Sequence, residues 1–163
     1  HETIEILGVN SIVVRNRVTL DGELVEETFD WYAQYRDGNV WYFGEESNDY
    51  ENGVVVSIKV SWEAGVNGAL PGIIMHANPQ VGDPYRQEYY AGEAEDMGQV
   101  LSVTESVVVP YGSYGGVLKT MDWTPLEPGK VEHKFYAPGI GLILEAMAEE
   151  GSGRVELIDI LHE

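Results

Sequence analysis

Residues 12–46 read IVVRNRVTLDGELVEETFDWYAQYRDGNVWYFGEE, and this stretch decides the fold class. Two turns, Asp21-Gly22-Glu23 and Asp37-Gly38-Asn39, separate three runs that are rich in β-branched and aromatic residues. An Asp-Gly pair between such runs is a strong hairpin signal, because glycine accepts the positive φ that a tight turn requires. The stretch therefore predicts three antiparallel strands, over residues 12–20, 24–35 and 40–46.

The same type of pattern continues along the rest of the chain. Further strands are expected over residues 54–62, 73–76, 85–90, 99–109, 117–124, 131–136, 142–149 and 154–161. The run 142–150 also suits a helix, but Gly151-Ser152-Gly153 joins it to an alternating segment, so we interpret it as a strand. We predict an all-β chain with one domain over residues 1–163, a single antiparallel barrel or half-barrel of about ten strands.

Charge and composition exclude several classes of function. The chain has 28 Asp and Glu against 9 Lys and Arg, a formal net charge of -19, so nucleic acid and anionic membranes are poor partners. It has no cysteine, which excludes disulfides, thiolate zinc sites and a cysteine nucleophile. No apolar run is long enough for a membrane span, and no phosphate-binding loop, nucleophile elbow or histidine pair with zinc spacing is present.

Aromatic residues are the strongest indication of a binding site. They are concentrated between Trp31 and Trp62, and neighbours on a strand point to opposite faces, so they cannot all share one core. A partly filled lumen lined by Trp and Tyr is typical of a small-molecule pocket, with Arg86 and Glu88 as polar contacts. The predicted ligand-binding residues are Trp31, Tyr42, Trp62, Arg86, Glu88 and Tyr90. The alternative is a large aromatic core with ordinary surface tyrosines.

Carboxylates supply two further hypotheses. Glu93, Glu95 and Asp96 follow Gly92 closely, and three carboxylates on one loop could coordinate calcium through oxygen ligands. The alternative for this segment is a solvated loop or a short first helical turn. Two acids in one pocket could instead perform acid–base chemistry, and the candidates for such an enzyme are Glu45, Glu63, Glu88, Glu93, Glu95 and Asp96.

Several motifs together resemble a group of uncharacterised exported bacterial β-rich proteins. They are Asp30–Gln34, Asp37–Glu45, Ser61–Gly65, Tyr85–Tyr90 with Gly92–Asp96, and His133-Lys134 before Tyr136–Leu142. The resemblance covers nearly the whole chain, although Tyr35-Arg36 and His76 depart from the pattern. It implies export and an additional amino-terminal β segment, but no established activity. The closing Tyr136–Leu142 element is also similar, at the level of fold analogy, to lipoprotein half-barrels that carry lipids.

These observations lead to one leading hypothesis and three alternatives. We expect a non-enzymatic domain of the cell envelope or extracellular space that binds an apolar or amphipathic small molecule. The alternatives are a calcium-binding protein, a carboxylate-based enzyme, and an assembly protein completed by a strand from a protein partner. The last follows from His1–Ile4, where the sequence opens inside an expected strand, so that amino-terminal strands are expected upstream and a sheet edge is left open.

Overall fold

A computed structural model of the chain describes residues 2–58, 61–148 and 153–161. These residues form fourteen β-strands and no helix, so the predicted all-β class is confirmed. Because no helix occurs in these ranges, none of the described residues belongs to a helix that is long and apolar enough to cross a membrane.

The chain divides into two compact units, each with its own antiparallel sheet. The first unit comprises His1–Ala77 and Gln87–Glu95, and the second comprises Asn78–Arg86 and Asp96–Glu163. In the described residues, neither sheet closes on itself through strand pairing, so the open half-barrel and not the closed barrel is compatible with the structure. One domain over the whole chain stays a prediction.

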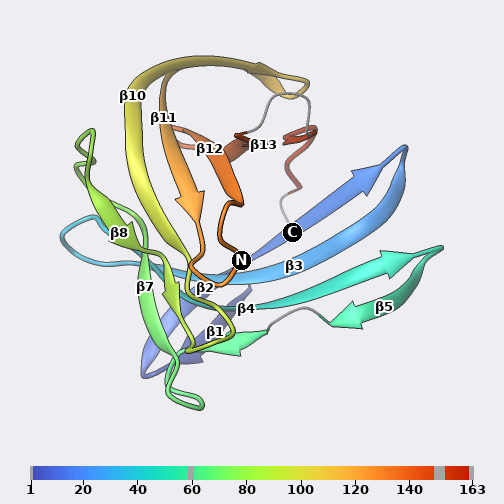
Figure 1. Ribbon diagram of the computed structural model, residues 1–163, viewed down its shortest axis with the longest axis vertical. Helices are drawn as coiled ribbons and strands as arrows, with labels where there is room; N and C mark the ends of the chain where they lie inside the picture. Colours follow the sequence, from blue (N-terminus) through green and yellow to red (C-terminus); the bar gives the residue numbers. More distant parts are fainter. Residues whose placement is uncertain (1, 59–60, 149–152, 162–163) are drawn as a thin grey trace. The chain divides into compact units, whose positions relative to one another are not determined.

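The sheet of the first unit has the strand order β1-β2-β3-β4-β7-β9, with β5 and β6 also paired to β4. Its long strands β2, β3 and β4 run side by side (Figure 1). The strands are β1 Thr3–Ile6, β2 Val9–Leu20, β3 Glu23–Gln34, β4 Val40–Glu51, β5 Val54–Ile58, β6 Trp62–Glu63, β7 Leu70–Met75 and β9 Glu88–Tyr89.

Turn chemistry explains the hairpins of this unit. Asp21 and Gly22 have φ values of 53° and 86°, and Asn52 and Gly53 have 51° and 76°. Two consecutive residues with positive φ match the right-handed twist of the flanking strands, and Asn, Asp and Gly adopt this conformation most readily. The predicted turn at Asp21-Gly22 is therefore confirmed, and Asn52-Gly53 adds a hairpin between β4 and β5.

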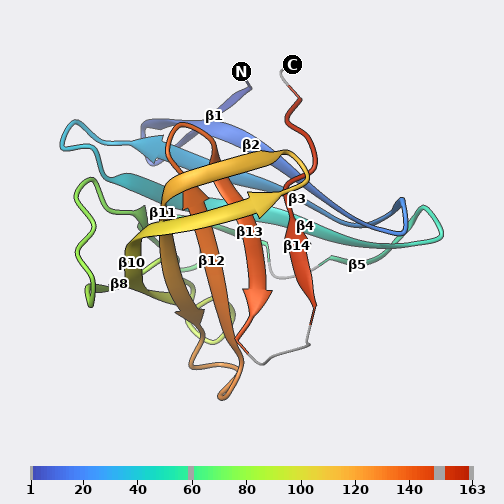
Figure 2. The same ribbon diagram turned by 90° about the horizontal axis from the view of Figure 1, so that it is seen from above.

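The sheet of the second unit has the order β14-β13-β12-β11-β10-β8. Figure 2 shows β10 to β13 lying next to one another in this sheet. The strands are β8 Pro84–Arg86, β10 Met97–Val109, β11 Gly112–Trp123, β12 Val131–Ala137, β13 Gly141–Met147 and β14 Arg154–Glu156. The interpretation of the ambiguous run after Gly141 as a strand is confirmed, since β13 pairs with both β12 and β14.

Three predicted strands differ from the observed ones. The strand expected over 54–62 appears as β5 over Val54–Ile58 and, from Trp62, as β6, because Ser61 belongs to no strand and residues 59–60 lie outside the described residues. The strand expected over 85–90 is split at Gln87, because Tyr85 pairs with Gly98 in the second sheet while Glu88 pairs with Pro71 in the first. The strand expected over 154–161 is only three residues long in the structure, since only Arg154–Glu156 pairs with β13.

Each unit has its own hydrophobic core. The core of the first unit holds Ile6, Tyr42, Phe43, Trp62, Ala64, Ala69 and Ala94. The core of the second holds Val107, Val109, Val117, Ala137 and Ile143. Burial of aromatic rings dominates the first core, and burial of aliphatic side chains dominates the second, so much of the aromatic surplus of the sequence belongs to one unit.

Candidate functional site

The aromatic residues of β3 and β4 are divided between the two faces of the sheet. Residues directly opposite each other on antiparallel strands point to the same face. Tyr32 pairs with Tyr42, and their rings are stacked with centroids 4.9 Å apart, whereas Ala33 pairs with Trp41. Tyr42 therefore lies on one face and Trp41 on the other, as the alternation along the strand predicts.

A β-bulge at Phe43 and Gly44 adjusts β4 at this point. Trp31 pairs with Gly44 and Tyr32 pairs with Tyr42, so Phe43 is the extra residue. Gly44 has a φ of 142°, and a Cβ atom there would lie 2.1 Å from the Trp62 carbonyl oxygen and 2.9 Å from the Trp31 ring. Only glycine fits this position, and bulges of this kind redirect side chains next to binding sites.

A surface hollow of about 290 Å³ opens on the Trp41 side of this sheet. Its lining residues are Val9, Ala33, Gln34, Tyr35, Asp37, Trp41 and Phe43. Three of them are aromatic, and Tyr35 is 62% exposed, so part of the aromatic surface is open to solvent. In the described part of the chain, neither the Trp41 Nε1–H nor the Tyr35 hydroxyl makes a hydrogen bond to the protein.

The turn after β3 holds the polar rim of the hollow in place. The backbone N–H of Asn39 donates to Asp37 Oδ1 at 2.9 Å, and Asn39 Nδ2 donates to Asp37 Oδ2 at 3.0 Å. Asn39 Oδ1 in turn accepts from the backbone N–H of Ala77 at 2.9 Å. A Cβ on Gly38, whose φ is 95°, would lie 2.9 Å from Ala77 Cβ, so the turn packs closely against this residue. The Asp37 carboxylate is thus fixed before any ligand arrives.

Four of the six residues predicted to bind a ligand lie in the first core or against it. Tyr42 and Trp62 are 6% and 3% exposed, and their rings meet edge to face with centroids 5.4 Å apart. Trp31 and Tyr90 are half-buried and pack against the same core. None of the four lines the hollow. Its aromatic lining consists of the exposed Tyr35, of Phe43 from the first core and of Trp41, which packs against that core.

The predicted polar contacts Arg86 and Glu88 belong to different units. Arg86 is exposed on β8, whereas Glu88 is buried on β9. Within the first unit, Trp62 Nε1 donates to Glu88 Oε2 at 2.7 Å. Glu88 therefore satisfies a buried indole, a role that the sequence pattern does not indicate.

Tyr42 is the centre of a buried polar group in the first unit. Its hydroxyl donates to Asp30 Oδ1 at 2.7 Å. Burial, together with the charges of Asp30, Glu45 and Glu88, raises the pKa of Tyr42 well above its usual value. Two of the acids proposed for an enzyme, Glu45 and Glu88, thus act on the same hydroxyl, while Glu63 lies half-buried on β6.

The three carboxylates predicted to bind calcium have separate surroundings. Glu93 is exposed, and Glu95 Oε1 accepts from the backbone N–H of Gly92 at 2.8 Å within the loop. Asp96 belongs to the second unit, where burial raises its pKa and Lys134 and a hydrogen bond with Thr124 partly offset this effect. Across residues 2–58, 61–148 and 153–161, no group of three or more His, Asp or Glu side chains is arranged to hold a metal ion. Calcium binding stays a prediction.

Lys134 is the centre of the polar group in the second unit. Its Nζ lies 3.6 Å from Asp122 Oδ2 and 3.8 Å from Glu145 Oε2, with 20% of the side chain exposed. Although burial opposes the charged form, the charges of Tyr136, Asp122, Glu145 and Glu132 raise the pKa of Lys134 well above its usual value.

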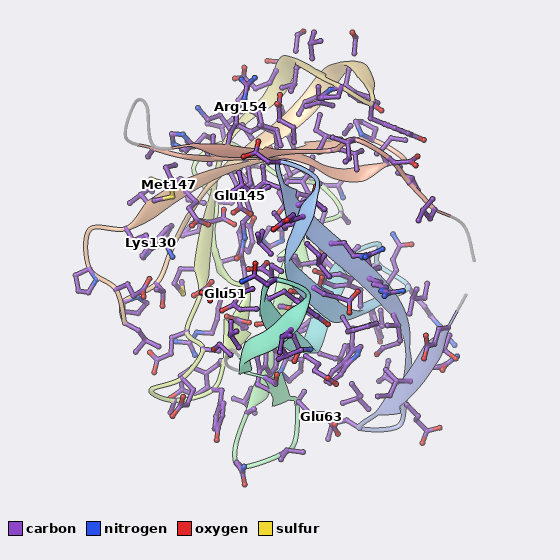
Figure 3. The ribbon with its side chains drawn as sticks, turned by 90° about the vertical axis from the view of Figure 1, so that its right-hand side faces the viewer. Glu51, Glu63, Lys130, Glu145, Met147 and Arg154 are labelled. Carbon is purple, nitrogen blue, oxygen red and sulfur yellow. The ribbon has the colours of Figure 1, made fainter. Side chains whose placement is uncertain are left out.

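Glu145 lies on the opposite face of the second sheet from Arg154. Figure 3 shows the two side chains on opposite sides of the sheet, as expected because Arg154 pairs with Ala146 and Glu145 with Val155. A hollow of about 180 Å³ lies beside these strands, and its lining residues are Glu145, Ala146, Met147, Gly153, Arg154 and Val155.

Comparison with known proteins assigns neither a family nor a function, because no family model, curated protein or solved structure matches this chain. A function for the chain must therefore be inferred from the geometry of the hollow and of the two polar groups.

Proposed function

We propose that this chain is an exported, non-enzymatic domain that binds an apolar or amphipathic small molecule in the hollow beside the Asp37 turn. The observation that carries the proposal is the lining of this hollow, where Tyr35, Trp41 and Phe43 join two small apolar residues around a fixed polar rim. Small-molecule sites are typically mostly apolar with a few placed polar groups, and they are largely formed before binding.

A location in the cell envelope or outside the cell is part of this proposal. The resemblance of the Asp37–Glu45 and Tyr85–Tyr90 motifs to exported β-rich proteins supports it. The absence of cysteine is compatible with such a location, since the fold then needs no particular redox state.

Binding of the uncharged dye N-phenyl-1-naphthylamine tests the proposal. We expect saturable energy transfer from tryptophan to the dye with a stoichiometry near one to one, since Trp41 lines the hollow. Tyr35→Ala should weaken binding, because it removes an exposed ring of the hollow without opening the core. Tyr111→Ala removes an exposed tyrosine of the second unit and serves as the matched control. Absence of saturable binding, or equal effects of the two substitutions, would overturn the proposal.

Assembly through strand addition is a second candidate, and β5 is the observation in its favour. Among the described residues β5 pairs only with β4, and Val54, Val55 and Val56 on it are 64%, 44% and 54% exposed. An apolar edge strand is a template for pairing with another chain. If a partner strand binds there, Val56→Lys should abolish concentration-dependent association in sedimentation velocity, and a parent protein that stays monomeric would exclude self-association.

A further inference from the structure

The hollow combines three aromatic side chains with a carboxylate whose partners are all neutral. Asp37 accepts hydrogen bonds only from the backbone N–H and side-chain amide of Asn39, and no Lys or Arg among the described residues forms an ion pair with it. The neighbouring cation, Arg36, does not line the hollow. The negative charge of Asp37 is therefore available to a ligand.

The net charge of the whole chain, like the Asp37 carboxylate, favours a cationic ligand. A net charge of -19 with only 9 Lys and Arg creates a negative potential that attracts cations and repels anions. An amphiphile with a carboxylate or phosphate head would have to place its charge near Asp37. Anionic ligands are thus disfavoured both by the rim of the hollow and by the field around it.

The lining also discriminates between kinds of cation. A hard metal ion requires several oxygen ligands to replace its hydration shell, and among the described residues Asp37 supplies the only carboxylate of this hollow. An alkylated ammonium ion is weakly hydrated, and the faces of Trp, Tyr and Phe rings attract it while its methyl groups gain apolar contact. The exposed Tyr35 and the half-buried Trp41, together with Asp37, match the second kind of cation, while Phe43 is buried and adds apolar lining.

We propose that the ligand of this hollow is a small organic ammonium ion, of the quaternary or alkylated type. The inference rests on the proposed function and makes the ligand specific. The aromatic rings would contact the alkylated ammonium group, and the Asp37 carboxylate would balance its positive charge. The same ammonium chemistry occurs in free solutes and in lipid headgroups, and binding to vesicles separates these sources.

Choline and its uncharged isostere 3,3-dimethyl-1-butanol form the decisive pair of probes, measured by displacement of N-phenyl-1-naphthylamine from the full chain. The two molecules have the same shape, so a difference between them reports the charge. We expect choline to bind at least about threefold more tightly than the isostere, and added sodium chloride to reduce this preference. Equal affinity of the two probes would overturn the inference while leaving the proposed function intact if the dye still binds.

Two matched variants test the role of the carboxylate. Asp37→Asn keeps an acceptor for the Asn39 backbone N–H but removes the charge, and it should abolish the preference for choline without changing the affinity for the isostere. Asp21→Asn removes the same charge from an exposed turn outside the hollow, and it should leave the preference unchanged. Equal loss in both variants would indicate only the general field of the protein and would overturn the assignment of Asp37.

Co-sedimentation with vesicles of phosphatidylcholine identifies the source of the ammonium group. Displacement of the dye by choline without binding to vesicles supports a free solute, and binding to vesicles that Asp37→Asn abolishes supports a headgroup. If neither choline nor the vesicles bind although the dye does, the ammonium class is excluded. If the dye does not bind either, the proposed function itself is contradicted.

Discussion

The first unit gives two of its carboxylates an aromatic donor, whereas the second unit places a lysine beside two carboxylates. In the first unit Tyr42 donates to Asp30 at 2.7 Å and Trp62 donates to Glu88 at 2.7 Å, although the buried Glu27 has a cation, Arg15, at 2.6 Å. In the second unit the charged Lys134 lies within 4 Å of both Asp122 and Glu145. With 28 acids and 9 bases in the chain, there are too few cations to pair with every acid, and two acids of the first unit have aromatic donors instead.

The two kinds of donor nevertheless respond to pH in the same direction, because the pKa of Tyr42 and the pKa of Lys134 are both raised. The raised pKa of Tyr42 keeps its hydroxyl protonated, so the donor to Asp30 is retained throughout the neutral range. The pKa of Lys134 is raised in the folded state, so its contribution to stability is complete below its unfolded value of 10.5 and is lost as the pH rises through the folded value. Both donors therefore stay protonated at neutral pH, and Tyr42 and Trp62 donate to acids in a chain that has few cations.

Removal of Trp62 should have the largest effect on stability. Trp62→Ala deletes a buried ring that contacts Tyr42 and leaves the Glu88 carboxylate without its indole donor, so we expect a loss of about 3–5 kcal/mol in the free energy of unfolding. Urea denaturation followed by circular dichroism measures it. Trp62→Phe keeps most of the ring and removes the N–H, and its loss should be smaller, about 1–3 kcal/mol. Equal losses in the two variants would show that packing around the ring contributes little beyond the hydrogen bond.

Removal of the cation in the second unit should cost nearly as much. Lys134→Met leaves Asp122, which is 5% exposed, without its ion-pair partner, and loss of one member of a buried pair costs about 3 kcal/mol or more. Lys119→Met removes the same charge from the neighbouring strand β11, where Lys119 lies over the Phe135 ring, and should cost less than about 1 kcal/mol. Chemical denaturation of both variants at pH 7 gives the comparison. Similar losses would mean that Lys134 acts through net charge alone.

Loss of the Tyr42 hydroxyl alone should reduce the free energy of unfolding by less than loss of the Trp62 ring does. Tyr42→Phe keeps the ring against Trp62 and Tyr32 but removes the hydroxyl that donates to Asp30, a charge-assisted bond worth about 1.5–3 kcal/mol. A double-mutant cycle with Asp30→Asn isolates the pair from its surroundings. Coupling near zero would show that the hydrogen bond from Tyr42 to Asp30 contributes nothing to stability.

The fold was predictable from local chemistry, whereas the site depended on contacts between distant residues. Asp21-Gly22 and the alternation in β3 predict the hairpins, and the Asn52-Gly53 pair was an equally clear turn signal that the strand predictions did not use. The alternation also predicts that Tyr42 and Trp41 face opposite ways. The alternation cannot tell which of the two faces becomes covered. The Tyr42 face is covered by Trp62, which lies well beyond Tyr42 in the sequence on a strand of only two residues.

The division into two sheets was equally hidden from local patterns. The run Tyr85–Tyr90 has the composition of one continuous strand, yet its two halves pair in different sheets. Partner choice at Gln87 depends on β7 and β10, which lie on either side of it in the sequence and offer no signal within the run. For the same reason, the sequence pattern places Arg86 and Glu88 in one predicted site, although the two residues belong to different units.

The smallest expected effect on stability concerns Asp96, whose burial outweighs the favourable effects of Lys134 and of its hydrogen bond with Thr124. Burial raises the pKa of Asp96 above its unfolded value of 3.8, so the folded chain binds this proton more tightly than the unfolded chain does. Stability contributed by Asp96 is therefore greatest at low pH and falls as the pH rises from 3.8 through the folded value. Asp96→Asn should thus stabilise the protein at pH 7, by less than about 1 kcal/mol, and this gain should shrink at pH 3, where the parent carboxyl is protonated. Glu93→Gln removes a charge that is close to Asp96 in the sequence but exposed, and it should give no gain that depends on pH in this way. Thermal unfolding of the parent protein and of both variants at pH 3 and pH 7 separates a local effect at Asp96 from a general effect of net charge. Equal gains in the two variants would reflect general relief of the net charge of -19 and would contradict a local cause at Asp96.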